Sequence, residues 1–309
     1  MNKIERVCAT LNGADVDRPP FSFWYHFGLQ HMPGEKVAEA EIDFFKAYDL
    51  DFLKVMSDYS YPLPDGLEVI ETADDWKRLQ SLEGTEPGWS EQLKALKLIN
   101  QALKGEALFI ETVFSPWTTA RRLARATGVE KAQKEHPDIL LEGMRVIAES
   151  LANYARRAIE MGASGIFYSV SGATNELMTE EEYSKWGRPF DLIILNAVKG
   201  APFNVLHIHG SNIHFDSLLD YPVAALNWSH YHTQPTLADG RHRWGRAVMG
   251  GIDEVTTSRV AIPDIRRQVR ETVEAVGKRG LIITPGCSVP TDTAYRTLNA
   301  IAESVKSLA

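Results

Sequence analysis

The sequence predicts an α/β protein built as a single (β/α)8 TIM barrel over residues 1–309, and three observations carry this prediction. Short apolar runs recur eight times along the chain, and amphipathic helical segments lie between most of them. The length of 309 residues suits eight such units. Because no low-complexity tract or Ser/Gly linker divides the chain, we expect one domain.

The predicted strands are rich in aromatic and β-branched residues, and Gly, Pro, Asp or Asn residues bound them. Strands that alternate with helices pair in parallel through right-handed crossovers. In chain order the expected strands are Pro20–Phe27, Asp51–Met56, Ala107–Phe114, Gly165–Val170, Phe203–Gly210, Ala224–Ser229, Ala247–Ile252 and Gly280–Cys287.

Two of the predicted helices have the clearest patterns. Asp138–Met161 keeps an apolar face at helical spacing, and Pro263–Lys278 begins near a Pro and ends before a Gly. Ser81–Ser90 contains two Gly and one Pro and is expected to be a surface loop. The alternative fold is an open doubly wound sheet. A Gly-rich phosphate loop after the first strand would favour it, but His-Phe-Gly stands at 26–28.

Composition excludes several classes of protein. Apolar residues make up 44% and charged residues 24%, which is typical of a globular protein. The formal net charge of -8 argues against a nucleic-acid or anionic-membrane surface. No run of 18 apolar residues is present, and the first residues lack the apolar core of a signal peptide, so we expect a cytoplasmic protein. Two cysteines do not make a disulfide framework.

The most specific chemical signal is a His-x-His pair on the fifth predicted strand. Side chains alternate along a strand, so His207 and His209 share a face. Cys287 closes the eighth strand at the same end of the barrel, where the active sites of such barrels lie. Two imidazoles and a thiolate suit zinc and leave a fourth position for a reactant. The alternative is a pair of hydrogen-bonded inner histidines with Cys287 as a small buried side chain.

Other residues near strand ends complete the expected site. Imidazole titrates near neutral pH and a carboxylate can guide a proton, so His230, His232 and Asp58 are candidates for proton transfer. The alternative interpretation is that the two histidines are exposed loop residues and that Asp58 only caps a helix or stabilises a turn. Glu111 is also a candidate for a fourth metal ligand. The expected catalytic residues are Asp58, His230 and His232, and the expected substrate-binding residues are His26, Glu111, Asn227 and Trp228.

With these residues in view, the chain resembles the uroporphyrinogen decarboxylase superfamily over essentially its whole length. That resemblance implies a single (β/α)8 barrel. The segments that carry it are ERVCATLNGADVDRPPF at the start, MSDYSYP after the second strand, GASGIFYSVSGATNELMTEEEYSKWGRPF around the fourth, and VLHIHGSNIHFDSLLDYPVAALNW across the fifth and sixth.

The resemblance divides into two branches. Authentic uroporphyrinogen decarboxylases carry an Arg motif after the first strand that binds the carboxylates of the substrate, but no Arg lies between Arg18 and Arg78 here. Asp58 matches the aspartate that contacts the pyrrole nitrogens. Cys287, within PGCSVP, replaces the decarboxylase histidine near the end of the eighth strand.

The second branch comprises zinc-dependent methyltransferases similar to the methylcobamide:coenzyme M enzymes. Their His-x-Cys on strand five and Cys at strand eight match His207 and Cys287, and His209 replaces the first Cys. The resemblance therefore implies a Zn²⁺-dependent methyl- or alkyltransferase that activates a thiol or other nucleophile, with a small-molecule substrate and a corrinoid-protein partner as methyl donor. The alternatives are a cofactor-free carboxy-lyase that uses Asp58 and a non-catalytic small-molecule-binding barrel.

Overall fold

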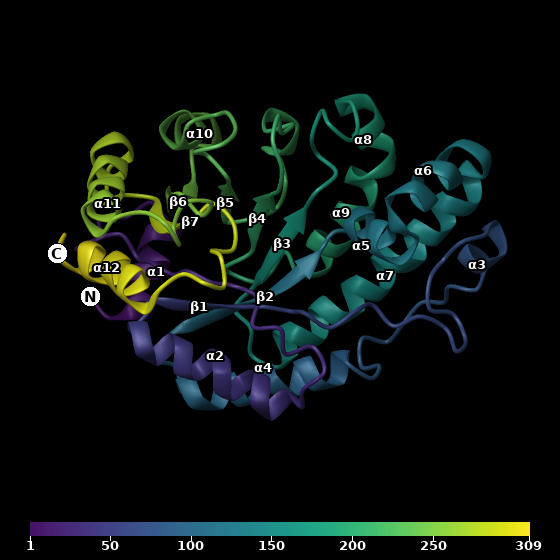
Figure 1. The fold of residues 1–309 in the computed structure, drawn as a ribbon, viewed down its shortest axis with the longest axis horizontal. Coiled ribbons are helices and arrows are strands. Elements are labelled where there is room, and N and C mark those ends of the chain that lie inside the picture. The colour runs from purple at the N-terminus through teal and green to yellow at the C-terminus, as the bar shows by residue number, and fades with distance from the viewer.

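Seven parallel strands form one curled sheet in the computed structural model, which describes residues 1–309 (Figure 1). Strand order in space follows strand order in the chain, so each strand pairs with the next and every connection returns over the same face. The strands are β1 (Phe52–Val55), β2 (Leu108–Phe114), β3 (Ile166–Val170), β4 (Val205–Ile208), β5 (Ala225–Trp228), β6 (Ala247–Ile252) and β7 (Leu281–Pro285).

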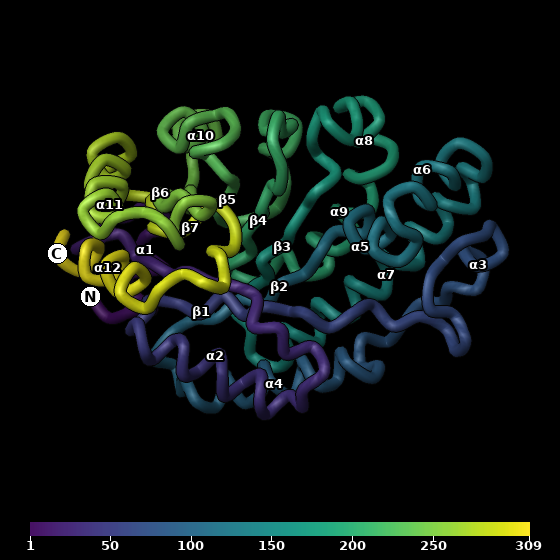
Figure 2. Tube along the Cα trace, viewed as in Figure 1, coloured from purple at the N-terminus to yellow at the C-terminus, as the bar shows by residue number.

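Helices surround this sheet, and the two chain ends lie on the same side of the molecule (Figure 2). The Lys278 ammonium links the ends, because it donates to the carbonyls of Asp17 and Leu308. The helices are α1 (Lys3–Leu11), α2 (Gly34–Tyr48), α3 (Ala73–Lys77), α4 (Trp89–Leu103), α5 (Pro116–Leu123), α6 (Arg125–Glu135), α7 (Pro137–Glu160), α8 (Glu180–Trp186), α9 (Arg188–Ala197), η1 (Asp216–Leu218), α10 (Leu237–Trp244), α11 (Ile262–Val276) and α12 (Tyr295–Lys306).

The first predicted strand, Pro20–Phe27, is not formed as a strand, so the eight-stranded closed barrel is not confirmed. The segment makes a single parallel bridge, from Phe21 to Ile283 of β7. Three backbone bonds hold it between β7 and β1: Ser22 N–H to Ile283 O, Ile283 N–H to Pro20 O, and Asp51 N–H to Phe21 O. Pro19 and Pro20 have no N–H to donate, and the Phe21 N–H donates to the Asp51 carboxylate instead of a strand.

Apolar side chains from the inner face of the strands fill the interior of the curled sheet. They alternate with residues that pack outward against the helices, as parallel strands covered by helices require. A separate, larger core lies between sheet and helices. The inner cluster comprises Val7, Trp24, Phe52, Met56, Ile110, Phe167, Phe203, Val205, Ala225, Ala247, Met249 and Ile282.

Other sequence predictions agree with the fold to within a few residues. The predicted helices at 138–161 and 263–278 correspond to α7 and α11, and most of Ser81–Ser90 is a loop that ends where α4 begins. None of the helices has the length and apolar character needed to cross a membrane.

Candidate metal centre

Three side chains offer their ligand atoms to one point at the carboxyl ends of the strands. His207 lies on β4, His209 follows it just beyond the strand, and Cys287 follows β7. Their ligand atoms all lie within 4.8 Å of one another. The Cys287 Sγ stands 3.8 Å from Nδ1 of His209. Although β4 and β7 are not neighbours, the curl of the sheet brings these ends together.

Asn227 on β5 sets the orientation of His207. Its register position is directly beside His207, and its Oδ1 lies 2.7 Å from His207 Nδ1. The Asn227 amide nitrogen donates to the carbonyls of Met249 and Pro285 at 3.0 and 3.1 Å, so its oxygen must face the imidazole. His207 Nδ1 therefore carries the proton, and the lone pair of Nε2 is left for a ligand.

The charge state of the cluster follows from its mutual contacts. Burial raises the pKa of the Cys287 thiol, but the imidazoles of His207 and His209 outweigh burial and lower that pKa to about 4. The hydrogen bond to Cys287 raises the pKa of His209 above its ordinary value. Cys287 is therefore a thiolate at neutral pH, which is the form that binds metal ions.

The cluster lines a cavity of ≈ 340 Å³. The lining of this cavity also includes two cations, Lys54 and Arg122, which were not predicted from the sequence. A Lys in the apolar run DFLKVM was a signal for the first, whereas no pattern distinguished Arg122 from other helix arginines. The remaining lining is aromatic or hydroxyl-bearing: Trp24, Phe114, Phe167, Thr112, Thr118, Ser169, Ser171 and Ser288, with His26 and Met56.

His26 and Asp58 lie together, as neighbours of this cavity. His26 lines it, and Asp58 lines an adjoining cavity of ≈ 280 Å³ that shares Thr112, Phe114 and Arg122 with it. The His26 Nδ1 is 2.6 Å from Asp58 Oδ1. Burial raises the pKa of Asp58, but the hydrogen bond from His26 and the electrostatic interaction with that ring leave the pKa below its ordinary value.

Three predicted substrate contacts are buried behind the cavity instead. Asn227 has no exposed surface and acts on His207. Glu111 is also fully buried, where it accepts from Tyr154 Oη at 2.6 Å and from the amide of Gln92. Trp228 packs against Phe215 and donates to the Pro235 carbonyl. Alternation along the strand explains Glu111 and Trp228, because each follows an inward-facing residue and so points away from the cavity. Asn227 shares the inner face with His207 and is covered by its own partners, His207, Met249 and Pro285.

His230 and His232 are likewise not brought into the cavity. His230 Nε2 accepts from the Gly251 N–H at 2.8 Å, and burial lowers the pKa of His230 to about 4. A ring nitrogen already bonded to the backbone has no lone pair left to accept a proton. His232 pairs with Asp253 at 2.7 Å, on the loops beyond β5 and β6. The two histidines organise these loops.

Comparisons with known proteins agree with this architecture. The chain is 24% identical to the uroporphyrinogen decarboxylase of Trichodesmium erythraeum, over 87% of this chain and 81% of the relative. It is 24% identical to that of Synechococcus sp. (strain JA-3-3Ab), over 99% and 93%.

Among solved structures, a methyltransferase from Methanosarcina mazei superposes with a TM-score of 0.77 at 18% identity, over 99% of each chain. A B12-independent methionine synthase from Shewanella sp. W3-18-1 gives 0.52 at 15% identity, over 70% of this chain and 66% of that one. These likenesses show a shared fold.

A sequence profile described as uroporphyrinogen decarboxylase (URO-D) matches residues 2–308. Relatives and structural neighbours are named as decarboxylases and methyltransferases, so the likenesses are to enzymes. Because the profile spans nearly the entire chain, this protein belongs to the uroporphyrinogen decarboxylase family.

Proposed function

We propose that this protein is a zinc-dependent methyl- or alkyltransferase of the uroporphyrinogen decarboxylase family. The observation that carries the proposal is the convergence of His207, His209 and Cys287, whose ligand atoms lie within 4.8 Å of one another. In a tetrahedral site with bonds of about 2.0–2.3 Å, ligand atoms are separated by about 3.3–3.8 Å. Small side-chain rotations are therefore enough to fit zinc.

The donor set also fits zinc chemically. Imidazole and thiolate are its preferred protein ligands, and three protein ligands leave one position for a reactant. When bound, zinc would supply a cationic centre that holds a substrate thiol as its thiolate. His209 in place of a second thiolate makes the set less electron-donating, and this supports a nucleophile class that includes groups other than thiols.

The residues of the chain would then orient the reactants and handle the proton. Asn227 holds His207 in the tautomer that offers Nε2. His26 is half exposed at the cavity and bonded through Nδ1 to Asp58, which leaves Nε2 to accept the proton released from the nucleophile. The 340 Å³ cavity suits a small substrate.

For the methyl donor, we propose a methylated corrinoid carried by a partner protein that docks over the cavity. The likeness in fold to a methyltransferase supports methyl transfer, and the sequence resemblance to methylcobamide-dependent enzymes is the reason for choosing this donor. The test is transfer of a methyl group from methylcobalamin to a small thiol in the presence of zinc-loaded protein. Transfer that disappears in Cys287→Ala supports the proposal, and equal rates with and without protein contradict it.

The second candidate is a cofactor-free carboxy-lyase. It is favoured by the curated relatives named uroporphyrinogen decarboxylase and by Asp58, which lines the adjoining cavity. Decarboxylation of an acid by metal-free protein would promote this candidate over the first.

A further inference from the structure

Lys54 is a buried cation that forms no direct ion pair. It lies on β1, is 2% exposed, and lines the same cavity as His207, His209 and Cys287. Its ammonium forms no ion pair, and its one hydrogen-bond partner is the thioether sulfur of Met56, a weak acceptor. The ammonium lies over the ring faces of Phe167 and Trp24, 4.7 and 5.3 Å from their centroids. A buried ammonium without a carboxylate partner costs stability.

None of the nearby acidic groups forms an ion pair with this ammonium. Glu41 accepts from the Met56 N–H at 2.8 Å, and burial raises its pKa to about 8. Burial likewise raises the pKa of Glu111 to about 7. Burial lowers the pKa of Lys54 only to about 8, because electrostatic attraction to Glu41 and Cys287, and then to Glu111 and Asp58, opposes the effect of burial. The ammonium therefore keeps most of its charge at pH 7.

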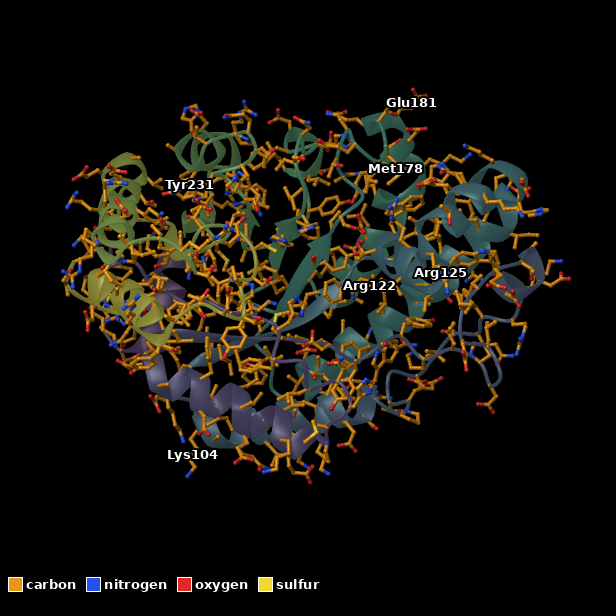
Figure 3. The ribbon with its side chains drawn as sticks, viewed as in Figure 1. Lys104, Arg122, Arg125, Met178, Glu181 and Tyr231 are labelled. Carbon is orange, nitrogen blue, oxygen red and sulfur yellow. The ribbon has the colours of Figure 1, made fainter.

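Arg122 supplies a second cation to the same cavity. It comes from the last turn of α5, and its guanidinium carbon lies 3.7 Å from the ring centroid of Phe114. Figure 3 shows Arg122 near the end of β2, close to the middle of the molecule. It forms neither an ion pair nor a hydrogen bond with the protein. Thr118, Ser169 and Ser171 add hydroxyl groups to this wall.

We propose that Lys54 and Arg122 form an anion subsite, which takes the carboxylate, sulfonate or phosphonate group of a small substrate. Ammonium and guanidinium groups only donate, and hydroxyls can donate, so the missing partner is an oxyanion. These cations come from β1 and α5, not from the segment after Pro20, which contains no Arg up to Arg78. The orientation of the substrate, with its far end toward Cys287, rests on the proposed function. The binding of an anion at Lys54 and Arg122 is independent of that function.

The test compares acids with a neutral analogue of the same length. We would titrate the 309-residue protein with 3-mercaptopropionate, 3-mercaptopropanesulfonate, 3-mercaptopropylphosphonate and 3-mercapto-1-propanol, and measure affinity by calorimetry. The three acids should bind at least about tenfold more tightly than the alcohol, and their ranking identifies the head group. Equal affinity for acids and alcohol would overturn the anion subsite.

Two variants locate the effect, and a third serves as control. Lys54→Met and Arg122→Met should each remove the preference for acids and leave the affinity for the alcohol unchanged. Lys278→Met removes a lysine that bonds only to backbone carbonyls, so it should keep the preference. Acid affinity that survives in both Lys54→Met and Arg122→Met contradicts the proposal.

Stability separates a functional lysine from a structural one. Because the unpaired ammonium is costly, Lys54→Met should melt at a higher temperature than wild type, and Lys278→Met at a lower one. If Lys54→Met fails to fold, Lys54 has a structural role. Arg122 is at an exposed position, so Arg122→Met would still test the binding of acids.

The same titrations distinguish this inference from the proposed function. Cys287→Ala should keep its preference for propionate over propanol while losing zinc. Loss of zinc without loss of the acid preference leaves the subsite standing. Loss of the acid preference in Lys54→Met with zinc retained leaves the metal centre standing. If Cys287→Ala binds the acids and the alcohol with equal affinity, the proposed anion subsite is wrong.

Discussion

His207 donates from Nδ1 to the side-chain oxygen of Asn227 across 2.7 Å, and this one bond fixes which ring nitrogen is offered as a ligand. A partner of this kind holds a metal-binding imidazole in one tautomer and one rotation. The two residues are opposite each other in the register between β4 and β5, so the sheet itself sets their distance.

Asn227→Ala should therefore weaken zinc binding about 10–100-fold, the usual effect of removing such a partner. Competition with a coloured chelator measures the affinity. Asn204→Ala is the matched control, because Asn204 is equally buried but bonds to the backbone at Ile166 and Val198. It should lower the melting temperature and leave zinc affinity unchanged. Equal zinc affinity in Asn227→Ala and wild type would show that the bond does not orient a ligand.

Cys287 in metal-free protein should react with iodoacetamide at a nearly constant rate from pH 5.5 to 8. Its pKa is lowered to about 4 by the two imidazoles, so the thiolate is fully formed above that pH. An ordinary thiol, with a pKa of about 8.5, loses about tenfold in reactivity for each unit below it. Mass spectrometry of alkylated peptides measures both cysteines at once. A rate for Cys287 that falls tenfold per unit across this range would refute the assigned thiolate.

Uroporphyrinogen should not be decarboxylated at rates typical of enzymes, which are about 1 per second or faster. The segment after Pro20 lacks the Arg motif that binds the carboxylates of uroporphyrinogen in the decarboxylases, and carboxylates left uncompensated in a pocket cost several kcal/mol of binding. The ≈ 340 Å³ cavity is also near the small end of ligand sites. Chromatography of the porphyrins after oxidation measures the product. Turnover at an enzymatic rate would favour the carboxy-lyase.

Limited proteolysis should yield no stable half-sized fragment, because we predict one folding unit over residues 1–309. The loop within Ser81–Ser90 has several exposed residues and is a candidate for cleavage. Electrophoresis over a time course follows the fragments. Two stable pieces that meet near this loop would show two domains.

The order and direction of the strands were predictable, because eight apolar runs alternate with helical patterns. The first run was misassigned for a local reason. PFSFWYHF has strand composition, but Pro19 and Pro20 cannot donate, and only Phe21 bridges to β7. Composition predicts that a segment is buried. It does not predict how many backbone hydrogen bonds that segment makes with neighbouring strands.

The site was predictable where spacing along one strand decides it. His207 and His209 are two residues apart, so alternation places them on one face without knowledge of the rest of the fold. The roles of Asn227 and His230 were not predictable in this way, because their hydrogen-bond partners are distant in sequence. Asn227 bonds to His207, and His230 accepts from the Gly251 N–H. Which histidine is free and which is bonded depends on such contacts, and one sequence does not contain them.

The metal content of the purified protein tests the central claim most directly. Protein made without a His tag, in added zinc and without chelator, should hold about one zinc per chain by mass spectrometry of the element. Ala variants of His207, His209 and Cys287 should each lower that occupancy. His214→Ala is the matched control, because His214 is a buried histidine bonded to Asn175 and outside the ligand cluster. A wild-type protein that contains no zinc would contradict the proposed metal centre.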